Sequence, residues 1–354
     1  MSSGMNYAPE AFIDKACEIG EFQIAAIGLE HGHIYGMCKN LENAGGKVIK
    51  VWDKDPAKAG KFREEFKDAA LVSGEEEILQ DPTIQMVASA DVPSERGPLG
   101  IRVLDSGKDF FSDKAPFTTL AQLEEAKKKV VQTGKIWAVC YSERIGSESG
   151  IFAGQLIQQD AIGKVIQVIG LGPHRLDASK RPDWFFKKTN YGGILCDIGS
   201  HQVEQFLYYA GAKNAEVVHS FVKNFHHPAF PELEDFGETN LIADNGATNY
   251  FRVDWFTPDG LGTWGDGRTI ILGTEGYIEI RKYIDIAKSQ DGDQVYLVNS
   301  EGEKHFSVKG KVGFPYFTAL ILDCLNRTEN AMSQAHTFKA AELSLLAQQN
   351  AERI

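Results

Sequence analysis

The chain has 354 residues, of which 43% are hydrophobic and 24% are charged, and its formal net charge is −12. This composition is typical of a soluble globular protein, and the length favours two domains over one core. The negative charge argues against non-specific binding to nucleic acid. Because no apolar run approaches the ~20 residues of a membrane span, we expect no membrane partner.

The cysteines indicate a reducing compartment. They are odd in number, scattered and without C-x-x-C spacing, so neither a disulfide framework nor a structural zinc site is predicted: Cys17, Cys38, Cys140, Cys196 and Cys324. Acidic residues interrupt the first 21 positions, where a signal peptide would need a continuous apolar core. We therefore expect a cytoplasmic protein.

Residues 1–20 are predicted to form an N-terminal extension, with a short helix from Pro9 to Gly20 suggested by the apolar spacing. From Phe22 strands and helices alternate. The segment FQIAAIGL is typical of a buried parallel strand that runs into Gly28, and the second strand ends at Asp53. Strand, glycine turn, helix, strand and acidic residue follow one another as in a dinucleotide-binding unit, so we predict an α/β Rossmann domain over residues 21–145.

Asp53 indicates the cofactor. It lies 25 positions after Gly28 (53 − 28), close to the ~20 expected for a carboxylate that accepts hydrogen bonds from ribose hydroxyls. A carboxylate there repels the 2′-phosphate of NADP, which favours NAD. Lys54 could offer a cation to that phosphate, so NADP remains possible.

The glycine loop departs from the usual G-x-G-x-x-G pattern. Glu30 and His33 stand where the second and third glycines belong, and a carboxylate at Glu30 would repel a pyrophosphate unless its side chain turns away. Gly32 would permit close backbone approach. His31 and His33 would either donate hydrogen bonds to phosphate or supply only local turn and capping polarity.

Further candidate cofactor contacts follow the later strands of this domain. Ligands in such folds bind outside the carboxyl ends of parallel strands. The residues predicted there are Ala90, Asp91, Pro93, Asp113 and Lys114. Lys114 follows an apolar strand and precedes Pro116, which makes it a catalytic candidate as well; the alternative is an ordinary solvated lysine.

After about residue 145 the pattern changes. A helix is followed by a strand-rich stretch in which DNG, PDG, TEG and SEG mark turns, and several strands alternate apolar with polar residues. Residues 146–354 are therefore predicted to form an α+β domain with a large open, mostly antiparallel sheet. A helical region closes the chain.

The densest chemistry lies in residues 191–211, where a glycine pair leads to Asp197 and His201. Apolar spacing predicts a helix from Gly199 to Ala210, closed by Gly211. Residues four apart on a helix are neighbours, so the carboxylate can orient the imidazole as a general base. Alternatively, Asp197 caps the helix and His201 is a polar surface residue.

Taken together, these motifs resemble the glucose-fructose oxidoreductase, inositol dehydrogenase and MocA (Gfo/Idh/MocA) family of pyridine-nucleotide-dependent oxidoreductases. The resemblance runs from about Phe22 to Arg353. It rests on five motifs in a fixed order: Gly28 to Gly32, Asp53 to Pro56, Asp113 to Pro116, Arg181 to Trp184, and the specific G-G-x-x-x-D-x-G-x-H from Gly192 to His201.

The resemblance implies an NAD(P)-dependent dehydrogenase that oxidises a CH–OH group of a sugar, polyol or related small molecule. In that reading Lys114 holds the substrate oxygen, His201 is the general acid/base, and Asp197 binds substrate or orients His201. The open sheet would form a homo-oligomer, dimer or tetramer. The family usually has E-K-P, whereas this chain has Asp113, Lys114, Ala115 and Pro116.

Candidate substrate contacts flank these motifs: Tyr141, Glu143, Arg144, His174, Arg181 and Trp184. Two alternative functions remain open, an NAD-dependent glycosidase of the same fold and a non-catalytic dinucleotide sensor. A metal site from Asp197, His201 and His31 or His33 is also conceivable. Because no dedicated metal-ligand spacing occurs, we predict no metal.

Overall fold

The structure, a computed structural model, describes residues 4–353, and the chain divides into two compact units. The parallel-sheet unit contains residues 5–140 and Phe314–Phe338. The open-sheet unit contains Gly4, Tyr141–Gly313 and residues 339–353. This division differs from the predicted boundaries in three respects, because residues 5–20 and 314–338 belong to the parallel-sheet unit and residues 141–145 belong to the open-sheet unit.

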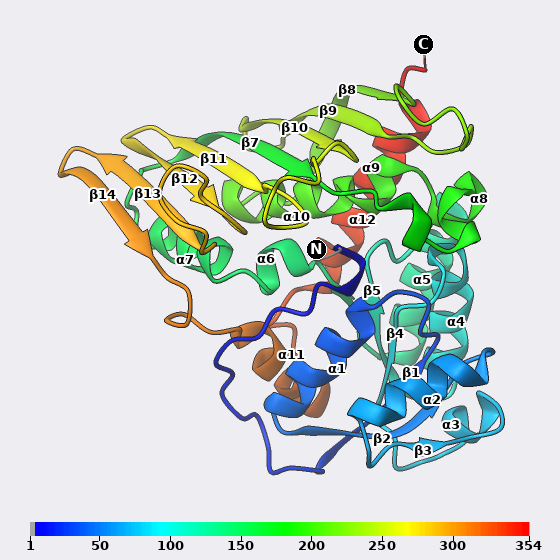
Figure 1. The fold of residues 1–354 in the computed structure, drawn as a ribbon. Coiled ribbons are helices and arrows are strands. Elements are labelled where there is room, and N and C mark those ends of the chain that lie inside the picture. The colour runs from blue at the N-terminus through cyan, green and yellow to red at the C-terminus, as the bar shows by residue number, and fades with distance from the viewer. Residues whose placement is uncertain (1–3, 354) are drawn as a thin grey trace. The chain divides into compact units, whose positions relative to one another are not determined.

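The parallel-sheet unit is built on a six-stranded parallel sheet with the order β3-β2-β1-β4-β5-β6 (Figure 1). Its strands are β1 (Phe22–Ile27), β2 (Gly46–Trp52), β3 (Ala70–Leu71), β4 (Met86–Ser89), β5 (Asp109–Asp113) and β6 (Trp137–Cys140). The strand order reverses between β1 and β4, which is the switch point where ligands bind in such sheets. The predicted Rossmann topology is confirmed.

Helices connect these strands: α1 (His33–Asn43), α2 (Pro56–Glu65), α3 (Glu76–Leu79), α4 (Pro93–Asp105) and α5 (Leu120–Thr133). Thr119 caps α5 by accepting a hydrogen bond from the Gln122 N–H, and Asp55 caps α2 in the same way. Helix α11 (Pro315–Asn326) returns from the far end of the chain and packs against α1. The central strands are almost wholly buried.

The N-terminal segment contains one short 3₁₀ helix, η1 (Gly4–Asn6), and residues 7–20 contain no helix. The prediction of a helix from Pro9 to Gly20 is therefore wrong. Phe12 and Ile19, whose spacing suggested a buried face, are 67% and 66% exposed. Backbone bonds fix the segment instead, from Ala16 N–H to Ala44 O at 2.8 Å and from Phe314 N–H to Phe12 O at 2.9 Å.

The open-sheet unit is built on an eight-stranded sheet with the order β14-β13-β12-β11-β7-β10-β9-β8. Its strands are β7 (Val165–Pro173), β8 (Ala215–Lys223), β9 (Phe236–Ala243), β10 (Thr248–Asp254), β11 (Arg268–Gly273), β12 (Gly276–Arg281), β13 (Gln294–Asn299) and β14 (Gly302–Ser307). Only the β7–β10 pair is parallel. The predicted large, mostly antiparallel sheet is confirmed.

One face of this sheet carries helices, and Figure 1 shows them gathered on a single side. They are α6 (Ser142–Ile145), α7 (Glu148–Gln158), α8 (Lys188–Tyr191), α9 (Ile194–Asp197), α10 (Gly199–Ala210) and part of α12 (Gln334–Asn350); η2 (Ala178–Lys180) and η3 (Asp183–Phe186) lie in the segment after β7. Helix α10 packs on β7 and β10. Residues of the other face alternate with buried ones and are more exposed. Within residues 4–353, no helix is long and apolar enough to cross a membrane.

Candidate functional site

The loop after β1 meets the turn after β4, at the switch point of the parallel sheet. Gly28 has a positive φ of 74°, which glycine adopts readily, and a side chain there would strike Asp91. The Ala90 N–H donates to Gly28 O at 3.0 Å, and the His31 N–H donates to Ala90 O at 2.8 Å. The two loops that carry most of the predicted cofactor contacts are therefore bonded to one another.

Asp53 lies at the carboxyl end of β2 and is 4% exposed. Its two carboxylate oxygens accept backbone hydrogen bonds from Leu29 N–H at 2.6 Å and from Asp55 N–H at 2.7 Å. These bonds hold the carboxylate beside the glycine loop. A charged acceptor at this place suits ribose hydroxyls.

Glu30 is the residue that seemed to oppose a pyrophosphate. Its carboxylate forms an ion pair with Lys58 at 2.6 Å and lies 3.9 Å from the Lys54 ammonium. Its charge is thus compensated by Lys54, in the connection after β2, and by Lys58, in the first turn of α2, and the expected electrostatic repulsion is reduced.

Gly32 precedes α1 and permits a close backbone approach, but the approaching group belongs to this chain. A Cβ at Gly32 would strike the Met5 carbonyl and the Asn6 side chain, and a Cβ at Gly36 would press against Ala8. The N-terminal segment therefore packs directly on the first turn of α1.

His31 and His33 converge with Asp113 at the end of β5. The His33 Nδ1 lies 3.0 Å from one oxygen of Asp113, and the His31 Nδ1 lies 3.7 Å from the other. Burial lowers the pKa of His31 well below its ordinary value, so this imidazole is neutral near pH 7. Burial acts to raise the pKa of Asp113, but His33 and Arg96 outweigh it and hold the carboxyl ionised.

These three residues have donor atoms within 4.8 Å of one another, a spacing that a metal ion could use. Arg96, however, donates to the same Asp113 carboxylate at 3.2 Å. A divalent cation would have to share this carboxylate with a buried guanidinium. The charge balance therefore favours an ion-paired hydrogen-bond network over a metal centre.

Lys114 directly follows β5 and is 5% exposed. Arg96 fixes the backbone around it by donating to the carbonyl oxygens of Lys114 and, at 3.1 Å, of Ala115. The Arg96 Nε also donates to Asp91 O at 2.7 Å, and Pro93 begins helix α4 just beyond. One buried arginine thus ties the turns after β4 and β5 together.

In the open-sheet unit, Asp197 ends α9 and His201 lies in the first turn of α10, with exposures of 7% and 2%. The predicted helix from Gly199 to Ala210 is confirmed, and Gly211 ends it in the left-handed conformation. Gly193 has a φ of 100°, and a Cβ there would strike Gln348. The glycine pair therefore lets the chain turn sharply into the segment that carries the Asp and the His.

A buried network lies behind His201. Glu143 is 2% exposed, and its Oε2 accepts hydrogen bonds from Gln202 at 2.9 Å and from the wholly buried Lys282 ammonium at 3.1 Å. The Lys282 ammonium also donates to the Gln205 side-chain oxygen at 2.6 Å, and the Gln205 amide donates to His201 O at 2.9 Å. Burial opposes ionisation, yet Lys282, His201 and His174 together lower the pKa of Glu143 to about 2.

Arg181 and His174 present further polar groups beside aromatic rings. The Arg181 guanidinium lies 4.5 Å from the centre of the Phe185 ring and 4.9 Å from that of Trp255. Burial lowers the pKa of Arg181 to about 10, against the opposing charge of Asp197. The His174 ring lies 4.5 Å from Trp264, and its Nε2 is 3.8 Å from Glu143.

The three remaining candidate substrate residues, Arg144, Tyr141 and Trp184, pack against side chains other than those just described. The Arg144 guanidinium is buried on the Glu204 carboxylate at 2.8 Å and lies 3.9 Å over the Tyr208 ring. Tyr141 is fully buried with its ring 6.3 Å from His201, and burial raises its pKa above the ordinary value. Trp184 is partly exposed and packs edge-on against Phe185.

Five of these buried partners escaped the sequence analysis: Arg96, Gln202, Glu204, Gln205 and Lys282. Gln205 lies four positions after His201, so the helical spacing alone could have singled it out. Arg96 and Lys282 gave no local signal. Their partners are 17 and 139 positions away, so only the folded sheets bring them into contact.

The two units together define the class of protein. A parallel sheet with a glycine turn at its switch point, and a buried carboxylate after β2, form a dinucleotide-binding fold whose residues fit NAD or NADP. The second unit supplies buried titratable groups on an open sheet. This combination is that of a nicotinamide-dependent oxidoreductase.

Comparisons with known proteins establish the family. Residues 22–141 match the oxidoreductase family with an NAD-binding Rossmann fold, and residues 152–279 match the Gfo/Idh/MocA C-terminal domain. The chain belongs to the Gfo/Idh/MocA family of oxidoreductases, and its parallel-sheet unit has the NAD-binding Rossmann fold of that family.

Individual relatives agree with this assignment. The chain is 28% identical over 269 residues to scyllo-inositol 2-dehydrogenase (NAD(+)) of Bacillus subtilis (strain 168), covering 73% of this chain and 74% of that protein. A crystal structure from Erwinia carotovora atroseptica, provisionally assigned as an oxidoreductase, shares 52% identity and a TM-score of 0.92 over 94% of this chain and 99% of its own. Levoglucosan dehydrogenase with NADH shares the fold, with 17% identity and a TM-score of 0.74 over 94% of this chain and all of its own.

Proposed function

We propose that the chain oxidises a secondary hydroxyl of a sugar or cyclic polyol, with His201 as general acid/base and Lys114 holding the substrate oxygen. The feature that supports this most is His201 itself. It is 2% exposed, lies one helical turn after Asp197, and sits in the unit whose sheet matches the family's C-terminal domain. A surface histidine would not be buried among Glu143, Gln205 and Tyr141.

The bound dinucleotide supplies the hydride acceptor. As the carbon loses hydride, the hydroxyl proton must pass to a base, and imidazole is the side chain that most often serves as a general base near neutral pH. Lys114 would stabilise negative charge that develops on the oxygen. Asp197 would orient His201 or bind a neighbouring hydroxyl.

The walls of the proposed substrate site suit a ring with several hydroxyls. Arg181 and His174 offer polar groups next to the faces of Trp255 and Trp264, and aromatic faces pack well on the C–H side of such rings. Tyr141 and Trp184 remain proposed contacts. Arg144, which is buried on Glu204, would act by positioning that carboxylate.

For the cofactor, we expect NAD to be preferred to NADP. The Asp53 carboxylate is fixed by two backbone N–H groups and would repel a 2′-phosphate. Lys54 lies 3.8 Å from Asp91 and 3.9 Å from Glu30, so its charge is already shared by two carboxylates. The other proposed contacts are those of the glycine loop and of the turns after β4 and β5.

We further propose a cytoplasmic homo-oligomer that forms through the open face of the eight-stranded sheet. This face exposes large apolar side chains from three of its strands, β9, β11 and β12: Ile242, Ile270, Leu272 and Tyr277. Exposed apolar patches of this extent favour protein–protein contact.

The test of the proposed reaction is a panel of sugars and polyols, including scyllo-inositol, myo-inositol, D-xylose and levoglucosan. Each is incubated with the purified protein and NAD or NADP, and formation of the reduced cofactor is followed by absorbance. At least one member should reduce NAD, with a lower KM for NAD than for NADP. No reduction with any member would contradict the proposed substrate class.

A further inference from the structure

The N-terminal segment lies along one face of helix α1, and Figure 1 shows it in dark blue beside that helix. A Cβ at Gly36 would press against Ala8, and the Asn40 side chain donates to Pro9 O at 3.4 Å. The contacts of the segment fall on every fourth residue of the helix: Gly32, Gly36, Asn40 and Ala44. The segment therefore follows α1 for about three turns.

This segment precedes the part of the chain that the family match covers. The match begins at residue 22, whereas residues 5–20 belong to the parallel-sheet unit by their contacts. The two glycines that make room for the segment, Gly32 and Gly36, lie inside the matched region. The packed segment is thus an addition of this chain to the shared fold.

The start of the segment reaches the glycine loop. A Cβ at Gly32 would overlap the side-chain oxygen of Asn6 and the carbonyl oxygen of Met5. Gly32 directly precedes α1, and in dinucleotide-binding folds the diphosphate lies at this helix end. Asn6 is therefore next to the position that the fold defines for the diphosphate.

Backbone N–H groups of the glycine loop are already engaged within the chain. The Leu29 N–H donates to Asp53 at 2.6 Å. The His31 N–H donates to Ala90 O at 2.8 Å. Because each N–H carries one hydrogen, these two groups have little left to offer a phosphate oxygen. A donor from outside the loop would therefore strengthen the binding of a diphosphate.

Asn6 can supply such a donor. Its side chain is exposed, and within residues 4–353 its amide forms no hydrogen bond. The amide oxygen is the atom that meets Gly32, which leaves the –NH₂ group with its two hydrogens available. The amide is neutral, so it also adds no negative charge beside Glu30.

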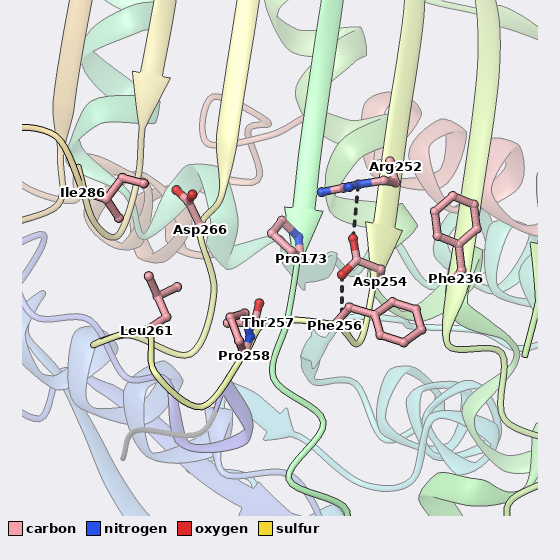
Figure 2. A pocket seen from close by; sticks show the side chains of 10 residues that line it. All are labelled: Pro173, Phe236, Arg252, Asp254, Phe256, Thr257, Pro258, Leu261, Asp266 and Ile286. Atoms are coloured by element: carbon pink, nitrogen blue, oxygen red, sulfur yellow. Dashed lines mark hydrogen bonds and ion pairs between the residues drawn. The ribbon is translucent and has the colours of Figure 1, made fainter. Parts of the chain in front are cut away.

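A pocket at one end of the eight-stranded sheet shows the opposite situation. Arg252 and Asp254 line it and pair with each other at 3.1 Å, and the Phe256 N–H donates to Asp254 at 3.0 Å (Figure 2). These charged groups have partners within the chain and indicate no ligand. Asn6 has no such partner among the described residues, and it lies beside a ligand position that the fold itself defines.

We propose that Asn6 is a cofactor-binding residue whose side-chain amide donates a hydrogen bond to the diphosphate of the bound dinucleotide. Residues 5–9 hold Asn6 in place because they pack on α1. The proposal rests on the dinucleotide-binding fold of the parallel-sheet unit, and it depends neither on the identity of the substrate nor on the role of His201.

Isothermal titration calorimetry of the purified protein with NADH, and separately with ADP-ribose, tests this role. Both ligands contain the diphosphate, and ADP-ribose lacks the nicotinamide. Asn6→Asp keeps the shape of the side chain but replaces the donor with a charged acceptor, so the Kd of both ligands should rise at least ~10-fold. Asn43→Asp is the matched control, because Asn43 is exposed at the other end of α1 and the same change of charge there should leave both Kd values unaltered.

Hydrogen–deuterium exchange provides a second measurement that needs no variant. Binding of NADH to the wild type should slow backbone exchange in residues 5–9, because Asn6 would then be held from both sides. Unchanged exchange in this segment, at an NADH concentration that saturates the protein, would contradict a contact between Asn6 and the cofactor.

The titrations can overturn the proposal in three ways. Unchanged Kd values in Asn6→Asp would show that the amide does not bind the diphosphate. A weaker affinity for NADH but not for ADP-ribose would place Asn6 beside the nicotinamide. A tighter affinity for both ligands would mean that the segment blocks the diphosphate position. A wild type that binds neither ligand would contradict the dinucleotide site as a whole, and the proposal with it.

Discussion

At the scale of single residues, the Glu143–Lys282 ion pair is the interaction near His201 whose disruption we expect to cost the most stability. Both side chains are buried, and both hold glutamines of α10 in place. A buried ion pair contributes little net stability as a pair, but either charge left alone is costly. The pair therefore fixes the position of α10 and hence of His201.

Lys282→Met should lower the free energy of unfolding by ~3–5 kcal/mol, because it leaves the Glu143 carboxylate buried without its cation. Urea denaturation measures the change. The matched control is Lys304→Met, which breaks an exposed ion pair with Glu301 and should have little effect. Equal losses in the two variants would mean that the burial of the pair does not matter.

Glu143 also predicts how stability depends on pH. Its pKa is lowered to about 2 in the folded protein from an ordinary value of 4.5. In this interval the unfolded chain binds the proton and the folded chain does not, so the contribution of Glu143 to stability is lost as pH falls from 4.5 towards 2. Tm should therefore fall less steeply through this window in Glu143→Gln than in the wild type. Parallel curves would contradict the lowered pKa.

At the scale of elements, two glycines of β7 let α10 approach the sheet. A Cβ at Gly170 would strike the side-chain oxygen of Gln202, and one at Gly172 would come within 2.9 Å of its amide nitrogen. Gln202 in turn donates to Glu143. The spacing between β7 and α10 is therefore coupled to the charge network behind His201.

Gly170→Ala should cost ~1–3 kcal/mol of stability, as overpacking usually does, and should lower kcat by displacing Gln202. Gly60→Ala is the control, because this glycine lies inside α2 with open space around it and should gain ~0.5–1 kcal/mol. Thermal unfolding and steady-state kinetics give the two readouts. Wild-type stability and kcat in Gly170→Ala would show that the contact relaxes without consequence.

The same elements show what the sequence could and could not predict. The bounds of α10 followed from apolar spacing and from a glycine that ends the helix, both local signals. The helix predicted for the N-terminal segment does not form. The apolar side chains of this segment do not line a buried helix face, and the backbone hydrogen bonds that hold it reach residues 44 and 314. Asp197 and His201 were proposed from a local motif, whereas Lys282 depends on a contact across 139 positions.

At the scale of the whole molecule, the open sheet face predicts assembly. Ile270→Lys places a charge at the centre of the apolar face, on a side chain that is 37% exposed in the monomer. Light scattering coupled to size exclusion should report an oligomer for the wild type and a smaller species for this variant. Val131→Lys, at an 85% exposed site on α5, should leave the mass unchanged. A monomeric wild type would rule out assembly through this face.

The central claim is that a buried histidine of the open-sheet unit moves the proton during hydride transfer. On the best substrate of the polyol panel, His201→Ala should lower kcat by ~10²–10⁴-fold, the usual size of a general-base contribution. His219→Ala, which removes a 41% exposed imidazole on β8, should keep wild-type kcat. Near-normal kcat in His201→Ala at saturating substrate would contradict the proposed role of His201.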